Sequence, residues 1–113
     1  MIIDVITHAE VLWAAATSAS LVIGDDDDAD GFAAAIDLKA TDLLANESLS
    51  FAFPGAAADA GAYLDGTATH ITNRLSTSER TITATITSVG AGTAGRTDVF
   101  VIYAVPTLVQ VTQ

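Results

Sequence analysis

The sequence predicts an all-β chain that folds as a β-sandwich or a jelly-roll-like barrel of about eight strands. Apolar and polar residues alternate in several segments, and a period of two is that of an extended strand, whose successive side chains point to opposite faces. Threonine, whose branched Cβ favours strands, occurs 15 times in 113 residues. Turn-forming pairs separate these segments. At this length we expect a single domain, residues 1–113.

The first third of the chain contains two expected strands around a long loop. Met1 to His8 are largely apolar and carry no turn signal, so they form either the first strand of the domain's own sheet or an extended N-terminal arm that adds to a neighbour's sheet. Ala9 to Ala16 are dense in alanine and could form a helix, but a strand is the preferred interpretation. Residues 21–23 and 32–38 are expected strands, and Gly24 to Gly31 form the loop between them.

The middle third alternates around Leu49, Phe51 and Phe53, which predicts a strand. Pro54-Gly55 then matches the central pair of a type II turn. Asp65-Gly66 is the dipeptide most typical of a two-residue hairpin, here between 62–64 and 67–72.

The last third predicts three strands of different character. Thr81 to Thr87 place threonines on one face and apolar residues on the other, so we expect a half-buried strand. Val99 to Val105 are apolar on both faces, and such a strand is either central in a sandwich or covered by a second subunit. Pro106 ends this strand before a short one at Leu108 to Val111, which we expect to be an edge or an arm.

Composition excludes several classes of protein. Half of the residues are apolar and mean hydropathy is +0.46, which indicates that part of the apolar surface meets another chain. The longest uncharged stretches are shorter than the ~20 residues that span a bilayer, and acidic residues stand where a signal peptide would carry positive charge. With no cysteine, disulfides, thiolate catalysis and sulfur-ligated zinc are excluded.

Charge is distributed unevenly along the chain. The net charge is −10, and residues 1–38 hold eight acids and no base, against six acids and four bases in residues 39–113. Such a surface is a poor partner for DNA or RNA, so we expect no nucleic-acid binding.

The one candidate metal site is the run of aspartates in the first third of the chain. Asp26, Asp28 and Asp30, followed by Gly31, have the spacing of a calcium loop, in which carboxylates converge on one hard cation. The twelfth position is Asp37 in place of the usual bidentate glutamate, and strands flank the loop in place of two helices. We therefore interpret the run as a solvated acidic loop, with calcium binding as the alternative.

No other motif indicates chemistry. Gly90 to Gly95 match G-x-G-x-x-G, but the expected strand that follows lacks the helix N-terminus that binds pyrophosphate, so we interpret the segment as a hairpin loop. His8 and His70 belong to no ligand or catalytic signature. Trp13, Tyr63 and Tyr103 could build a sugar-binding platform, although single aromatic residues on apolar strands usually belong to a core. We expect no enzyme, no catalytic residue and no resident cofactor.

The segment from Ala40 to Phe51, followed by Tyr63 to Thr67 and a strand of threonine and isoleucine, resembles small virion proteins of tailed bacteriophages, above all capsid decoration (cement) proteins. The resemblance covers about residues 33–105 and includes a Leu-x-x-x-Glu turn that opens a strand. It implies a β-sandwich that binds the outer face of an assembled capsid, as a trimer or dimer, and stabilises the shell. No catalytic residue carries over.

The sequence thus leads to the hypothesis of a structural virion protein. Its expected partners are the major capsid protein and copies of itself, and its expected place is the capsid exterior, after synthesis in the host cytoplasm. The expected contact surfaces are Met1 to Val5 and Val99 to Val111. The alternatives are a calcium- or carbohydrate-binding β-sandwich module, or a structural protein of the neck or tail.

Overall fold

The computed structural model describes residues 1–15, 17–50, 60–63, 76, 78–105 and 107. Within these residues every regular element is a strand and there is no helix, which confirms the prediction of an all-β chain. In this part of the chain there is accordingly no helix that could cross a membrane.

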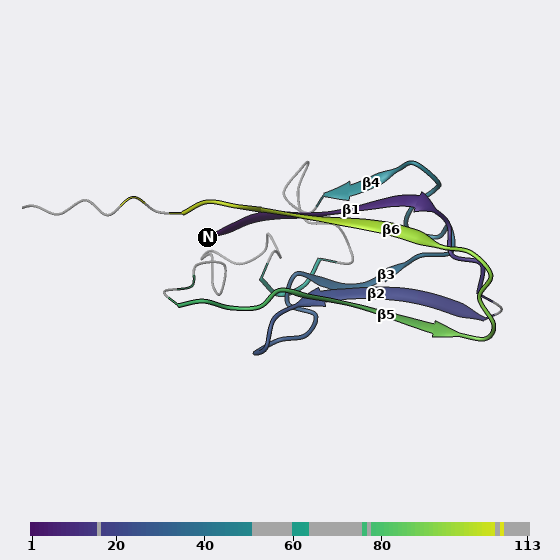
Figure 1. Cartoon of the computed structure of the whole chain (residues 1–113), viewed down its shortest axis with the longest axis horizontal. Coiled ribbons are helices and arrows are strands. Elements are labelled where there is room, and N and C mark those ends of the chain that lie inside the picture. The colour runs from purple at the N-terminus through teal and green to yellow at the C-terminus, as the bar shows by residue number, and fades with distance from the viewer. Residues whose placement is uncertain (16, 51–59, 64–75, 77, 106, 108–113) are drawn as a thin grey trace, which may run out of the picture.

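The strands form two antiparallel sheets of three, which lie as two layers (Figure 1). The first sheet has the order β4-β1-β6 and the second the order β3-β2-β5. The bounds are β1 Ile2–Val11, β2 Ser18–Gly24, β3 Ala33–Asp37, β4 Ser48–Ser50, β5 Thr83–Val89 and β6 Arg96–Tyr103.

β1 is the central strand of the first sheet. It pairs with β4 on one side and with β6 on the other, in a register that places Val5 opposite Val101 and Ile6 opposite Ser50. Of the two interpretations of the first eight residues, the structure has the strand of the chain's own sheet, and not the extended arm. The alanine-dense segment at 9–16 continues this strand to Val11 and forms no helix.

The core lies between the two layers. From β1, Val5 and Ala9 point into it, and from β2, Leu21 and Ile23 do so. Because successive residues of a strand face opposite sides, this alternation defines the inner face of each sheet. The other buried apolar residues are Ile2, Ala15, Ala19, Phe32, Ala33, Ile36, Leu38, Leu43 and Tyr63.

Three connections cross between the sheets at the same end of the molecule (Figure 1, right). They join β1 to β2, β3 to β4 and, through Gly90 to Gly95, β5 to β6. The first and the last hold each other through backbone hydrogen bonds from Ala14 N to Ala94 O (2.9 Å) and from Thr93 N to Ala14 O (3.2 Å). The predicted hairpin loop at Gly90 to Gly95 is therefore wrong, because the two strands that it joins belong to different sheets.

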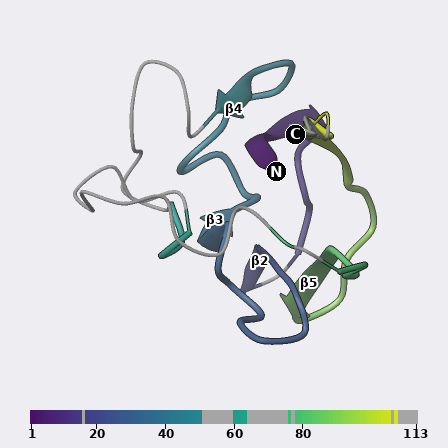
Figure 2. The same ribbon diagram turned by 90° about the vertical axis from the view of Figure 1, so that its left-hand side faces the viewer.

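Among the described strands, β5 and β6 are the outer members of their sheets, and much of their surface is exposed. All seven residues of β5 are exposed, so the prediction of a half-buried strand is wrong although the strand itself is present. β6 has one face turned to the core, where Val99 and Val101 are half-buried, while Phe100 and Ile102 are exposed on the other. Within the described residues β6 has a strand neighbour on one side only, so this part of the chain does not show it as a central strand. Viewed end on, β4 of the first sheet lies at the top and β5 of the second sheet lies at the lower right (Figure 2).

Some predicted elements fall outside the described residues. They are the end of the strand at 51–53, the turn at Pro54-Gly55, the hairpin at Asp65-Gly66 and the short strand at 108–111. Six strands lie within the described part of the chain. The expected total of about eight remains a prediction.

Candidate functional site

Asp25, the first residue after β2, organises the acidic loop. Its Oδ1 accepts hydrogen bonds from the backbone N–H groups of Asp27 (3.1 Å) and Asp28 (3.0 Å). An aspartate that accepts from its own following backbone stabilises a tight turn, because it satisfies donors that have no strand partner. The side chain is buried, so the loop starts from a fixed carboxylate.

Tyr63 packs over the base of this loop. Its hydroxyl donates to Asp25 Oδ1 (3.2 Å), and its backbone N–H donates to Gly31 O (2.7 Å). Its ring meets the edge of Phe32 at 5.1 Å between centroids and 78° between planes. A Cβ at Gly31 would lie 2.5 Å from the Tyr63 ring, so only glycine lets the ring approach this backbone.

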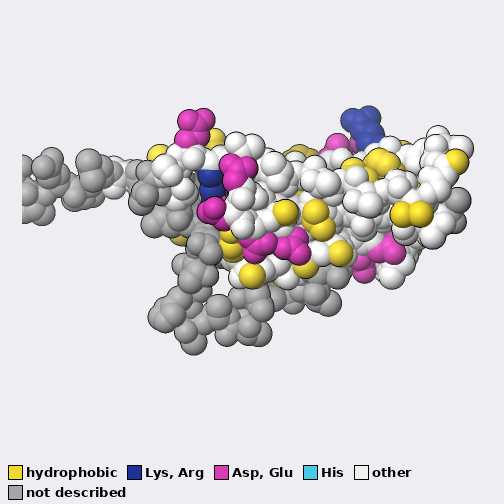
Figure 3. Space-filling view, turned by 90° about the horizontal axis from the view of Figure 1, so that it is seen from below, with side chains coloured by type: hydrophobic (Ala, Val, Ile, Leu, Met, Phe, Trp, Pro, Cys, Tyr) yellow, Lys and Arg dark blue, Asp and Glu magenta, His cyan; other side chains and the backbone are white. Residues whose placement is uncertain are grey.

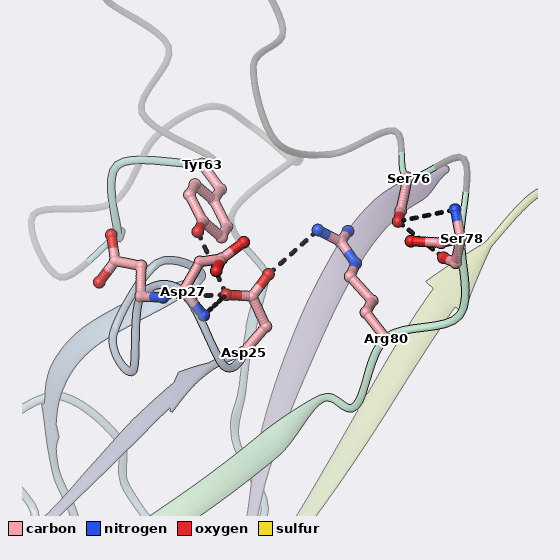
Figure 4. Close-up of polar contacts among 7 residues, drawn as sticks. Asp25, Asp27, Tyr63, Ser76, Ser78 and Arg80 are labelled. Atoms are coloured by element: carbon pink, nitrogen blue, oxygen red, sulfur yellow. Dashed lines mark hydrogen bonds and ion pairs between the residues drawn. The ribbon is translucent and has the colours of Figure 1, made fainter.

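Arg80 reaches the same carboxylate from the segment that precedes β5. Its Nη1 lies 3.1 Å from Asp25 Oδ2, and its guanidinium carbon lies 5.3 Å from the centroid of the Phe32 ring. The arginine thus neutralises the buried aspartate and stacks on an aromatic face. Figure 4 shows the Tyr63 hydroxyl and the Arg80 guanidinium each approaching one oxygen of the Asp25 carboxylate.

A polar hollow of about 240 Å³ lies beside these residues. Asp25, Tyr63 and Arg80 form one wall, and Ser76 and Ser78 form another (Figure 4). Asp26, Asp27 and Glu79 also line the hollow. Its volume lies below the roughly 300–1,000 Å³ of a typical small-molecule pocket, so it suits at most an ion or one sugar unit.

The three predicted calcium ligands do not converge on one point, although the side chains of Asp28 and Asp30 contact each other. Asp26 and Asp30 are exposed, and the Asp28 Oδ1 accepts from the backbone N–H of Asp30 (3.4 Å). Asp37 lies at the end of β3, where its Oδ1 accepts from Lys39 N (2.7 Å). Within the described residues no three side chains of the metal-binding kind lie close enough to hold one ion.

Crowding of carboxylates shifts two ionisations at this site. A hydrogen bond between the side chains of Asp28 and Asp30 raises the pKa of Asp28, and desolvation and the charges of Asp30 and Asp25 add to the effect. Burial raises the pKa of the Tyr63 hydroxyl, and the hydrogen bond to Asp25 raises it further. Each of the two groups therefore loses its proton at a higher pH than the free side chain does.

A second, apolar groove lies next to the polar hollow, and both are lined by Ser76, Ser78, Glu79 and Arg80. It measures about 650 Å³, and Met1, Ile82, Val101, Tyr103 and Val105 are among the residues that line it. The N-terminus closes onto the end of β6, since Met1 N donates to Ala104 O (2.6 Å) and Ala104 N donates to Met1 O (2.8 Å).

Large exposed apolar side chains gather at this end of the first sheet. We call Met1, Ile3, Ile102, Tyr103 and Val105 the apolar end. Val105 is 78% exposed and Tyr103 is 66% exposed. The apolar end falls within Met1 to Val5 and Val99 to Val111, the two segments that the sequence predicts as contact surfaces.

The remaining candidates lie apart from the polar hollow. His8, on the outer face of β1, bonds Ser48 Oγ through Nδ1 (2.8 Å), while His70 lies outside the described residues. Trp13 Nε1 donates to Thr97 Oγ1 (3.0 Å) beside the crossing connections, and Tyr103 lies at the apolar end. The structure does not bring Trp13, Tyr63 and Tyr103 together into a platform.

Sequence reasoning missed the two residues that fix the site, Asp25 and Arg80. The calcium motif begins one residue later, at Asp26, so the buried Asp25 lies outside it. Its position directly after an apolar strand was an available signal, because aspartate favours the first position of a turn. Nothing local indicated Arg80, which lies 55 residues away.

Comparisons with family models, with curated proteins and with solved structures find no match to this chain. The resemblance to capsid decoration proteins therefore depends on the sequence features described above.

Proposed function

We propose that this chain is a structural virion protein that decorates the outside of a bacteriophage capsid and stabilises the shell. It does so through contacts with the major capsid protein and with copies of itself. In this proposal the two described sheets are the layers of a β-sandwich of about eight strands.

The apolar end is the observation that carries the proposal. Tyr103 and Val105 expose large apolar side chains next to a groove of about 650 Å³. Contiguous exposed apolar surface beside such a groove is typical of a protein interface, because covering it with a partner removes apolar area from water. The resemblance to decoration proteins names the major capsid protein as that partner.

Charge supports a protein partner over the packaged genome. The chain carries a net charge of −10, which repels the phosphate backbone of nucleic acid. A protein on the outer face of a capsid does not need to contact DNA, and an acidic outer surface suits it.

The test is co-sedimentation of the purified chain with capsids of the phage whose genome encodes it. We expect saturable binding at a fixed number of copies per capsid. Quantitative mass spectrometry of whole virions should give the same copy number. A copy number of about a dozen or fewer would place the protein at the neck or tail instead.

A pair of matched variants locates the contact. Val105→Glu adds a charge at the apolar end and should weaken capsid binding at least about tenfold, since a charge in a desolvated contact is costly. Leu44→Glu adds the same charge at an exposed leucine between β3 and β4, and should bind as the wild type does. Equal binding by both variants would exclude the apolar end as the contact surface.

The polar hollow supports a second candidate, a module that binds calcium or a small carbohydrate. Carboxylates, two serines and the Tyr63 hydroxyl line one small hollow, and such groups serve both kinds of ligand. Calorimetric titration with Ca²⁺ and with simple sugars tests it, with Asp26→Ala and Asp27→Ala, at two residues that line the hollow, as comparisons. Binding heat that these variants abolish would favour the module over the virion protein.

A further inference from the structure

The free edge of β5 lacks the features that usually protect an edge strand. Edge strands normally carry charged side chains, prolines or bulges that prevent pairing with another chain. Residues 81–95 contain no charged residue and no proline. The pairing of β5 with β2 runs without a bulge from Ser18–Val89 to Gly24–Thr83, so β5 is a regular strand over its whole length.

Within the described residues, β5 pairs with β2 alone. All seven of its residues are exposed, and Ile86, which shares the inner face with Leu21, is 39% exposed. An isoleucine at an inner position is normally covered. The edge of the second sheet is therefore open at both its backbone and its inner side chains.

Because β5 carries no charge, this edge is a place where charge does not oppose a second copy of the chain. A second copy of the chain also carries −10, so most of its surface repels the first copy. Along β5 there is no charge to repel. In Figure 3, acidic side chains lie at the left, in the middle and at the right of this side of the molecule, with uncharged surface between them.

The sequence of β5 is also self-complementary. Thr83, Thr85 and Thr87 share the outer face, and Ala84 and Ile86 share the inner face. In an antiparallel pair of two such strands centred at Thr85, Thr85 lies opposite Thr85, Thr83 lies opposite Thr87, and Ala84 lies opposite Ile86. Threonine pairs across strands are favourable, and a two-fold axis makes the contact closed.

β6, the outer strand of the other sheet, fits a second copy less well. It begins with Arg96 and carries Asp98, and Arg96 bonds Glu10 and lies near Asp98. Charges of this kind on an edge oppose strand addition.

We propose that β5 pairs antiparallel with β5 of a second copy across a two-fold axis, which joins the two β3-β2-β5 sheets into one sheet of six strands. The inference deepens the proposed function, since it names the contact between copies that the decoration protein would use. Ile86 becomes covered in this dimer.

Sedimentation equilibrium of the purified chain tests the proposal, with single substitutions at the centre of β5. Wild-type protein should have the mass of two chains. Thr85→Glu and Thr85→Lys should each have the mass of one, because like charges meet at the axis. An equimolar mixture of these two variants should recover the mass of two chains, since the charges are then opposite.

Thr41→Glu is the matched control, because it adds the same charge at an exposed threonine between β3 and β4, away from the β5 edge. It should remain dimeric. Circular dichroism establishes that each variant keeps its strands. A monomeric wild type, a Thr85→Glu protein that keeps the wild-type mass, or a mixture that stays monomeric would overturn the proposal.

Capsid binding separates this inference from the function on which it rests. A wild-type monomer that binds capsids overturns the β5 dimer and leaves the decoration function standing. A β5 dimer that binds no capsid supports the dimer and overturns the decoration function.

Discussion

Arg80 Nη1 lies 3.1 Å from Asp25 Oδ2, although 55 residues separate the two in the chain. The side chain of Asp25 is only 5% exposed. This ion pair joins the segment before β5 to the end of β2, so it fixes the acidic loop to the second sheet.

Removing Arg80 should destabilise the fold strongly. Arg80→Met leaves a buried carboxylate without its cation, and we expect a loss of about 2 to 3 kcal/mol in the free energy of unfolding. Arg96→Met is the matched control, because Arg96 is 66% exposed and its pair with Glu10 (2.9 Å) lies in water. That variant should lose at most about 1 kcal/mol. Urea denaturation measures both, and equal losses would contradict the structural role of Asp25.

Stability should fall in alkaline solution because of Tyr63. Its pKa is raised above the ordinary value of 10.0, so above that pH the unfolded chain releases the phenolic proton before the folded chain does. The folded state then binds more protons, and the free energy of unfolding decreases as pH rises through the folded pKa. In Tyr63→Phe this component should disappear, as thermal melts across alkaline pH would show. Ultraviolet titration of Tyr103→Phe observes Tyr63 directly, and an unshifted titration would contradict the prediction.

The core contains one hydroxyl whose removal should increase the free energy of unfolding. Thr7 is fully buried, and its Oγ1 has no hydrogen-bond partner among the residues that the structure describes. Thr7→Val keeps the shape and removes the desolvated hydroxyl, so we expect a gain of about 1 kcal/mol in the free energy of unfolding. Thr7→Ser keeps the hydroxyl and removes a methyl group, and should lose about 1 kcal/mol. A loss in Thr7→Val would mean that the hydroxyl is satisfied.

Gly95 should not tolerate a side chain, whereas Gly92 should. Gly95 has φ +156°, and a Cβ there would lie 2.4 Å from Cδ2 of Trp13. Gly95→Ala must therefore displace the indole and its hydrogen bond to Thr97, at a cost of about 2 kcal/mol. At Gly92 the nearest atom to a new Cβ would be 3.8 Å away, so Gly92→Ala should change stability by less than about 1 kcal/mol. Thermal unfolding followed by tryptophan fluorescence compares the two, and similar midpoints would contradict the packing of Trp13.

The alternation of residue types predicted the strands, because the period of two is a local property of the extended chain. Alternation at 81–87 predicted β5, and the apolar run from Val99 predicted β6. The same signals failed to predict burial on these strands, since burial depends on which strands become neighbours. Within the described residues β5 is an outer strand, which leaves Ile86 exposed, and Phe100 lies on the face of β6 that is turned away from the core, although both residue types suggested cover.

Gly90 to Gly95 illustrate the same limit. Glycine density predicts a turn, which the structure has, but not whether the strands on either side pair with each other. The answer depends on Ala14 and Ala15, about 80 residues earlier in the chain, which bond this segment and hold it as a crossing connection between the sheets.

The sequence by itself determined that this protein is built from strands and that its first third is strongly acidic. It also determined that half of the residues are apolar and that mean hydropathy is +0.46. These are properties of local pattern and composition, and they need no knowledge of distant contacts. Only the tertiary structure decided that Asp25 is the buried member of the acidic run, that Arg80 neutralises it, and that β5 and β6 lie at open edges. Each of these depends on residues far apart in the chain meeting in space, because packing of the two sheets selects neighbours that no local pattern specifies.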